Sequence, residues 1–272
     1  MRIRRLLEGI PMMIFSIIIM PIQYISVGLT VGSSLLFSIF GFGVIPRFFA
    51  HLEAKVLFFL DGKLIHVYGK NNIDPDKNYL FVMNHASVFD IPAILGFTPR
   101  ISWLGHNRFL KVPGFGAFLK AIQFIPVYPG DHMKSKAAID TAIAHAKQLA
   151  IAIFPEGTRT RDGKLRPFKK GFVHIMRGSE LDILPVTLNG FFTMKPRHRW
   201  ATNPFVRLEV FIHKPILRES LIPKSDDAIV EIVRSTIASA YHDQEEWLFP
   251  WPSILKKQKL DAKMTRRKAD KS

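Results

Sequence analysis

The sequence contains no cysteine among its 272 residues. This absence excludes disulfide bonds, a thiolate nucleophile of the protein and every zinc site that uses cysteine ligands. Catalysis by this chain would therefore use oxygen or nitrogen groups, or a thioester that a substrate brings with it. The sequence also contains no internal repeat, so it is not organised as a repeat array.

Charged residues are absent from Gly9 through Pro46, and most of this run is apolar. A single membrane-spanning helix needs about 20 residues. This run is too long for one simple span and could supply two short helices. Pro21, Gly28 and Gly32 offer a turn. We therefore predict that residues 1–47 form a membrane-embedded helical hairpin, which either spans the bilayer or dips into one leaflet. A cleaved signal peptide is the alternative, although the apolar run continues well past the small residues that could form its cleavage site.

Acidic residues are scarce, with 22 Asp and Glu against 38 Lys and Arg, which gives a net charge of +16. Such a balance favours polyanionic partners, either nucleic acid or an anionic bilayer. The 48% of hydrophobic residues indicates that apolar and basic residues are segregated, which favours the membrane. Arg4, Arg5 and Arg47 flank the apolar run, and the positive-inside rule then places the catalytic domain on the cytosolic side of the inner, cytoplasmic membrane. Lys256–Ser272 is predicted to be a basic disordered tail.

Two fully apolar runs, Tyr79–Met83 and Leu149–Phe154, are typical of strands that are buried on both faces of a parallel sheet. Apolar and polar residues alternate near residues 63–68 and 206–212, which predicts two more strands. Helical periodicity at residues 134–147 predicts an amphipathic helix. The fold class predicted for residues 48–255 is therefore α/β, with a mostly parallel central sheet flanked by helices.

The first of these runs leads directly into a histidine, His85, which is followed five positions later by Asp90. In open α/β sheets, ligands bind where strands end in loops. An aspartate that accepts a hydrogen bond from one imidazole nitrogen fixes the tautomer, and the other nitrogen can then take a proton from a substrate hydroxyl. Alternatively, this is a loop histidine that a nearby carboxylate satisfies for purely structural reasons.

The second run leads into Glu156, Gly157, Thr158 and Arg159. A glycine lets the backbone approach a ligand closely, a threonine donates and accepts hydrogen bonds, and an arginine presents a planar fork that suits phosphate oxygens. We interpret Arg159 as part of a phosphate pocket. The further cations of residues 160–170 are interpreted as a solvated or lipid-facing surface.

A second basic stretch combines Lys195, Arg197, His198 and Arg199 with Trp200. Aromatic and basic side chains together suit the interface between a membrane and water. We therefore interpret this stretch as a loop at the membrane surface.

Together, the two strand ends resemble the glycerolipid acyltransferase superfamily, specifically the 1-acyl-sn-glycerol-3-phosphate acyltransferases. That family carries a histidine, four variable residues and an aspartate, as at His85 to Asp90, and then a Phe-Pro-Glu-Gly-Thr-Arg block, as at Phe154 to Arg159. Pro167–Gly171 and Pro185 match two further blocks of the family. The resemblance covers roughly Tyr79 to Gly190, and the apolar N-terminus is consistent with the family's membrane anchor.

This resemblance implies an enzyme that transfers an acyl group to the free sn-2 hydroxyl of 1-acyl-sn-glycerol 3-phosphate, giving phosphatidic acid. Its donor would be a thioester of coenzyme A or of acyl carrier protein. No metal or resident cofactor is implied, and the other partner is an anionic membrane surface rather than nucleic acid. The residues that the resemblance assigns are His85 as general base, Asp90 as its orienting partner, and Glu156, Gly157, Thr158 and Arg159 as the acceptor site.

One block departs from the family pattern. The family often has a lysine-rich start and an Ile-Asp-Arg-like end there, whereas this chain reads His106-Asn107-Arg108 and Val127-Tyr128-Pro129. Fewer cations at this edge would weaken the demand for a free phosphomonoester, so another lysophospholipid or lyso-lipid acceptor is the first alternative. A basic protein that binds membranes or nucleic acid without catalysis is the second.

Overall fold

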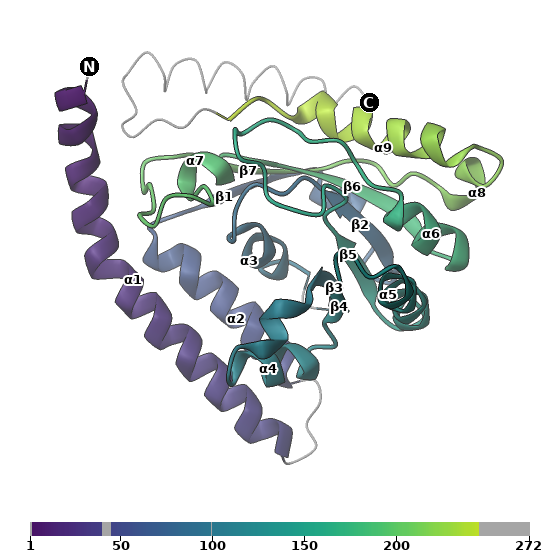
Figure 1. Cartoon of the computed structure of the whole chain (residues 1–272), viewed down its shortest axis with the longest axis horizontal. Helices are drawn as coiled ribbons and strands as arrows, with labels where there is room; N and C mark the ends of the chain where they lie inside the picture. Colours follow the sequence, from purple (N-terminus) through teal and green to yellow (C-terminus); the bar gives the residue numbers. More distant parts are fainter. Residues whose placement is uncertain (1, 40–44, 99, 245–272) are drawn as a thin grey trace.

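The computed structural model describes residues 2–39, 45–98 and 100–244, and its centre is a seven-stranded sheet (Figure 1). The strand order is β1-β7-β6-β2-β5-β3-β4. Strands β2 to β6 are parallel to one another, whereas β7 runs antiparallel to β6 and pairs in parallel with β1. The mostly parallel sheet predicted from the sequence is therefore confirmed. The strands are β1 (Ile65–Tyr68), β2 (Tyr79–Met83), β3 (Ile101–His106), β4 (Ile125–Val127), β5 (Ala150–Ile153), β6 (Asp182–Asn189) and β7 (Leu208–Ile212).

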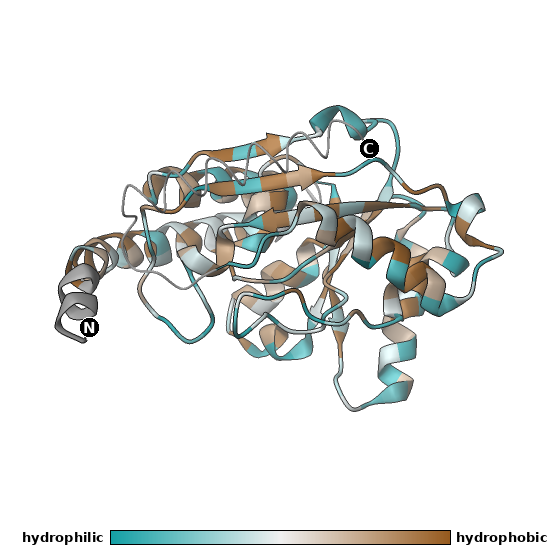
Figure 2. Cartoon of the chain, turned by 90° about the horizontal axis from the view of Figure 1, so that it is seen from above, coloured by the Kyte–Doolittle hydropathy of each residue, from teal (hydrophilic) through white to brown (hydrophobic). Residues whose placement is uncertain are grey.

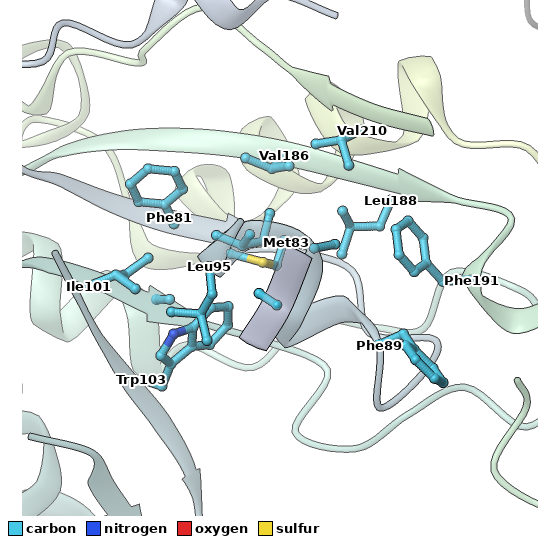
Figure 3. Packing of buried hydrophobic residues seen from close by; sticks show 14 of the residues in the cluster. Phe81, Met83, Phe89, Leu95, Ile101, Trp103, Val186, Leu188, Phe191 and Val210 are labelled. Carbon is cyan, nitrogen blue, oxygen red and sulfur yellow. The ribbon is translucent and has the colours of Figure 1, made fainter. Parts of the chain in front are cut away.

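Strand β2 is buried on both faces of the sheet, as its apolar run predicts. Because side chains alternate along a strand, Phe81 and Met83 belong to one hydrophobic core, and Leu80 and Val82 belong to the other. The first core is shown in Figure 3, where Phe81 and Met83 lie among side chains from neighbouring strands and helices. The centre of the sheet therefore gives β2 and its neighbours a fixed position.

Helices cover both faces of the sheet, and hydrophobic residues recur along the strands between them (Figures 1 and 2). Helices α2, α3 and α4 supply buried residues to the core that contains Phe81, whereas α5, α6 and α9 pack on the opposite face. Among the described α-helices, the Asp131 side chain caps the N-terminus of α5 and the Ser225 side chain caps that of α9. The helices that follow the N-terminal one are α2 (Ile45–Leu60), α3 (Asp90–Leu95), α4 (Phe115–Ala121), α5 (His132–His145), α6 (Gly171–Gly178), α7 (Phe191–Met194), α8 (Arg218–Leu221) and α9 (Asp226–Ala240), with 3-10 turns at Lys70–Asn72 and Asn107–Lys111.

The N-terminal segment is one continuous helix, α1 (Arg2–Ile39), so the turn predicted between Pro21 and Gly32 is wrong. Polar side chains recur along one face of α1 and bind two carboxylates of the neighbouring helical segment. Gln23 donates a hydrogen bond to Asp61 at 2.8 Å, and Ser26 and Thr30 each donate one to Glu53 at 2.8 Å. These contacts need an unbroken helix. The reversal of chain direction comes instead between α1 and α2, which pack against each other.

The opposite face of α1 is apolar and exposed, with Ile17, Ile18, Ile25 and Leu29 among its side chains. Its stretch Ile10–Phe37 has a mean hydropathy of 2.0 and is long and apolar enough to cross a membrane. So large an apolar surface is uncommon on a protein that lies wholly in water. The predicted disordered tail at residues 256–272 lies outside the described residues.

Candidate active site

The two strand ends that the sequence singled out meet at one edge of the sheet. Strand β2 lies next to β5, with Val82 paired to Ile153, so the loops that follow both strands emerge side by side. The backbone N–H of His85 donates to the Glu156 carboxylate at 2.7 Å, and the backbone N–H of Thr160 donates to the His85 carbonyl at 2.9 Å. Residues 71 positions apart in the sequence are thus joined directly at the candidate site.

His85 and Asp90 form a tight pair. His85 Nδ1 lies 2.7 Å from Asp90 Oδ2, and the Asp90 side chain is fully buried while that of His85 is 17% exposed. The same oxygen accepts the backbone N–H groups of Ala86 and Ser87 at 2.7 and 2.8 Å. Asp90 is also the first residue of α3, where a negative charge is favoured. An ionised Asp90 requires Nδ1 to be the donor, which leaves Nε2 unprotonated and able to accept a proton.

An aromatic stack fixes the plane of the imidazole. The His85 and Phe154 rings are parallel within 13°, with centroids 3.9 Å apart, and Trp103 in turn stacks on Phe154 with centroids 5.6 Å apart. In the sequence Phe154 is only the first residue of a motif, and nothing there indicates its contact with His85. The stack, together with the bond to Asp90, sets the direction in which Nε2 points.

Glu156 is buried, with 4% of its surface exposed, and both of its oxygens bind backbone. One accepts the His85 N–H, and the other accepts the Arg166 N–H at 3.2 Å. Burial raises the pKa of Glu156 to about 8 against the opposing effect of these two hydrogen bonds. The resemblance implies that Glu156 binds the acceptor, but its contacts in this structure hold the two loops together behind the site.

Substitution Glu156→Gln tests this supporting role. The folded-state pKa of about 8 exceeds the ordinary value of 4.5, so protonation favours the folded state. That stabilisation is fully present below pH 4.5 and is lost as the pH rises through 8. We expect the free energy of unfolding of the unsubstituted protein to fall between pH 5 and about pH 8.

The variant should lose part of that pH dependence. Its free energy of unfolding should also fall by about 1–3 kcal/mol, because an amide cannot accept both N–H groups. Urea denaturation in detergent micelles across this pH range measures both effects. Glu219→Gln, at an exposed position on α8, is the matched control. An unchanged pH slope in Glu156→Gln would contradict the assignment.

Gly157 and Arg159 follow Glu156 in the same loop. Gly157 has a φ of +71°, and a side chain there would meet the ammonium group of Lys169 at 3.1 Å. Thr158 and Arg159 are half-buried. Burial lowers the pKa of Arg159, as does nearby Arg197. Within the part of the chain that the structure describes, no carboxylate forms an ion pair with Arg159, so its guanidinium can receive an anion.

The cationic loop that follows is held in place by the C-terminal part of the described chain. The Tyr241 hydroxyl and the Gln244 N–H both donate to the Gly163 carbonyl, at 2.5 and 3.1 Å. Gly163 has a φ of +76°, and an added Cβ would lie 1.9 Å from the Gln244 carbonyl oxygen, so only glycine fits. The surface interpretation agrees with the exposure of four of its five cations, Arg161, Lys164, Lys169 and Lys170.

Ser87, in the turn between His85 and Asp90, reaches a segment that sequence reasoning did not connect with the site. Its hydroxyl donates to the Lys195 carbonyl at 2.8 Å. Lys195 is half-buried, and burial beside Arg199 and Arg159 lowers its pKa to about 8. Among residues 2–39, 45–98 and 100–244, no group of three or more histidine, aspartate or glutamate side chains could hold a metal ion.

Comparison with known proteins gives matches to acyltransferases. Residues 64–189 match the model of the Acyltransferase family. A 1-acyl-sn-glycerol-3-phosphate acyltransferase from Cocos nucifera is 31% identical over 52% of this chain and 46% of its own length. The alpha enzyme of that name from Mus musculus is 26% identical over 71% of this chain and 67% of its own length. The chain thus spans about half the length of the first relative and two thirds of the second.

A solved structure has the same fold. The crystal structure of the 1-acyl-sn-glycerophosphate (LPA) acyltransferase from Thermotoga maritima superposes with a TM-score of 0.68. The two chains are 24% identical, and the match covers 87% of this chain and 94% of the other. The likeness at this level of identity is a likeness of fold, and it includes the mostly parallel sheet on which the site is built.

Proposed function

Starting from the match of residues 64–189 to the Acyltransferase family model, we propose that the protein transfers a fatty acyl group to 1-acyl-sn-glycerol 3-phosphate. The donor is an acyl thioester of coenzyme A or acyl carrier protein, the acceptor group is the free sn-2 hydroxyl, and the product is phosphatidic acid. One observation carries the proposal: the His85 and Asp90 pair is bonded, through the His85 backbone, to the loop that holds Arg159.

The chemistry follows from the placement of the pair. Asp90 holds Nδ1, so Nε2 of His85 takes the proton of the acceptor hydroxyl as its oxygen attacks the thioester carbonyl. The new C–O bond forms, the C–S bond breaks, and the imidazolium returns the proton to the departing thiolate. The thioester is already activated, so general base catalysis of about 10²- to 10⁴-fold together with positioning of the reactants is sufficient. No acyl-enzyme is needed in this direct transfer.

The acceptor is oriented by its phosphate. Arg159 presents a guanidinium that no carboxylate pairs with in the described chain, and a planar fork binds two phosphate oxygens at once. Held in this way, the glycerol backbone presents its hydroxyl to His85. The names of the relatives from Cocos nucifera and Mus musculus point to the same acceptor. The missing cations near residues 106–108 favour another lyso-lipid as the second candidate.

The membrane supplies both lipids. We propose that the exposed apolar face of α1 lies in the bilayer and that the cationic surface of the domain faces anionic headgroups on the cytosolic side. Each Lys or Arg near such a surface contributes on the order of 1 kcal/mol, and the contribution falls with salt. Spanning and one-leaflet insertion are both consistent with the length of α1.

An acceptor panel tests the proposed function. Purified protein in phosphatidylcholine vesicles receives one labelled acyl-CoA and, in turn, lysophosphatidic acid, other lysophospholipids or no acceptor. We expect thiol release and labelled phosphatidic acid with lysophosphatidic acid, and at least about tenfold less product with the others, because each good charge-assisted bond contributes about 1.5–3 kcal/mol. Transfer to a different acceptor only would assign the second candidate. Salt-dependent binding of DNA without thiol release from any donor, including acyl carrier protein thioesters, would assign the non-catalytic alternative.

A further inference from the structure

The segment at residues 193–203 is built as an ordered wall of the site rather than a solvated loop. Arg199 organises it from within, because its guanidinium donates to the carbonyls of Thr193, Met194 and Ala201 at 2.6, 2.9 and 3.0 Å. The Lys195 ammonium donates to the Arg199 carbonyl at 2.5 Å. Arg199, which sequence reasoning grouped with its neighbours as a membrane-facing cation, therefore has an internal structural role.

This wall is fixed between the catalytic turn and the membrane helix. At one end, Ser87 donates to the Lys195 carbonyl at 2.8 Å. At the other end, the backbone N–H of Thr202 donates to the Ser16 hydroxyl of α1 at 2.9 Å. In Figure 1 the loop that follows α7 runs toward α1. Residues 195–202 therefore connect the turn of His85 with the helix that carries the exposed apolar face.

The wall also brings positive charge to the site. Among the neighbouring charges, Arg197 lowers the pKa of Arg159 most. Arg159 in turn lowers the pKa of Lys195. No carboxylate forms an ion pair with Arg159, Lys195 or Arg197 in the described residues. Asp90, which acts on Arg159 from nearby, is already bonded to His85, Ala86 and Ser87. Like charges held together in this way are stabilised by a bound anion.

We propose that Lys195 and Arg197 determine acceptor specificity by binding the acceptor phosphate together with Arg159. The inference rests on the proposed function and deepens it, because it names the residues that select a free phosphomonoester. Arg108 is the one cation of residues 106–108 and also acts on Arg159, so Lys195 and Arg197 add two positive charges to the one that this block supplies.

A general attraction to anionic lipid is the competing role for these two cations. Lys195 is half-buried and its ammonium is bonded to the Arg199 carbonyl, which suits a fixed ligand better than a diffuse surface. Arg197 is exposed, and Trp200 beside it is 49% exposed, so the rim of the wall also reaches the interface. The experiment therefore varies the vesicle charge as well as the residues.

The test compares KM and kcat of single variants, measured with lysophosphatidic acid in pure phosphatidylcholine vesicles. Lys195→Met keeps most of the aliphatic stem without the charge, and Arg197→Gln leaves a shorter, uncharged polar side chain. Each should raise the acceptor KM about tenfold while kcat changes less than about threefold, as expected when binding is lost equally from ground and transition states. The Ki of glycerol 3-phosphate, a soluble phosphomonoester, should rise by the same factor. Arg159→Gln shows how far the acceptor KM rises when a phosphate-binding cation is lost, and the other variants are compared with it. Lys195→Arg, which keeps the charge, should retain most of the affinity for the acceptor.

Two matched controls lie far from the site. Lys147→Met and Arg100→Gln remove exposed cations that lie shortly before β5 and directly before β3, at the opposite end of these strands from His85, and both should leave KM unchanged. An unchanged KM in Lys195→Met and Arg197→Gln would overturn the inference. It would also be overturned by a KM shift that appears only in anionic vesicles, or by a loss of kcat that Lys195→Arg does not restore. Lack of transfer by the unsubstituted protein would instead refute the proposed function.

Discussion

His85→Ala is expected to abolish acyl transfer from an acyl thioester to the lyso-lipid acceptor. The variant removes the imidazole that is bonded to the Asp90 carboxylate and that is joined, through the His85 backbone, to the loop of Arg159. General base catalysis contributes about 10²- to 10⁴-fold, so kcat should fall by a factor in that range. Thiol release in phosphatidylcholine vesicles measures it. The acceptor KM should change little, because Arg159 and its neighbours remain in place.

The matched control is His174→Ala, at an exposed position on α6 on the far face of the sheet. Its kcat should equal that of the unsubstituted protein. The thermal midpoint of His85→Ala should stay within a few degrees, since the side chain is part-exposed and the backbone bonds to Glu156 and Thr160 do not involve it. An undiminished rate in His85→Ala would remove the pair from the mechanism.

Asp90→Asn carries the second largest expected effect. An amide keeps the shape of the carboxylate but not its charge, so it no longer holds Nδ1 as a donor or stabilises the imidazolium that forms during transfer. We expect kcat to fall by at least about 10²-fold. The buried carboxylate also accepts the Ala86 and Ser87 N–H groups, so the free energy of unfolding should fall by about 1–3 kcal/mol.

Activity and stability have to be measured on the same preparation to separate these effects. Asp140→Asn, at an exposed position on α5, is the control and should alter neither quantity. A loss of kcat at a temperature well below the midpoint of Asp90→Asn would show that orientation of His85, rather than unfolding, is affected. A rate equal to that of the unsubstituted protein would show that the 2.7 Å contact is only structural.

The sheet and the approximate position of the site could be predicted because their signals are local. A strand that is buried on both faces has to be apolar throughout, and Tyr79–Met83 is such an apolar run. Since parallel strands end at the same edge, two motifs that follow such strands were expected to share that edge. His85 and Asp90 are five residues apart, so a single turn was enough to bring them together. Short helices such as α4 and α6 were not predicted, because a few residues carry too little periodicity.

Contacts between distant segments were not predictable in the same way. The hairpin prediction placed a turn at Pro21 to Gly32 because proline and glycine favour turns, but the polar row of α1 is satisfied by Glu53 and Asp61 only along an unbroken helix. Nor does the sequence say which side of its loop Glu156 faces. Its partners are backbone N–H groups that packing brings to it, and they leave no visible pattern.

The sequence by itself therefore determined which groups the candidate site contains: no thiol, a histidine with a carboxylate, and an arginine on a glycine loop after a second buried strand. The tertiary structure alone decided which groups surround them, including the stack of Phe154 on His85, the inward-facing Glu156 and the wall that carries Lys195 and Arg197. The physical reason is that side-chain type and spacing are written along the chain. The burial, hydrogen-bond partner and neighbouring charge of a side chain depend on segments that only packing brings together.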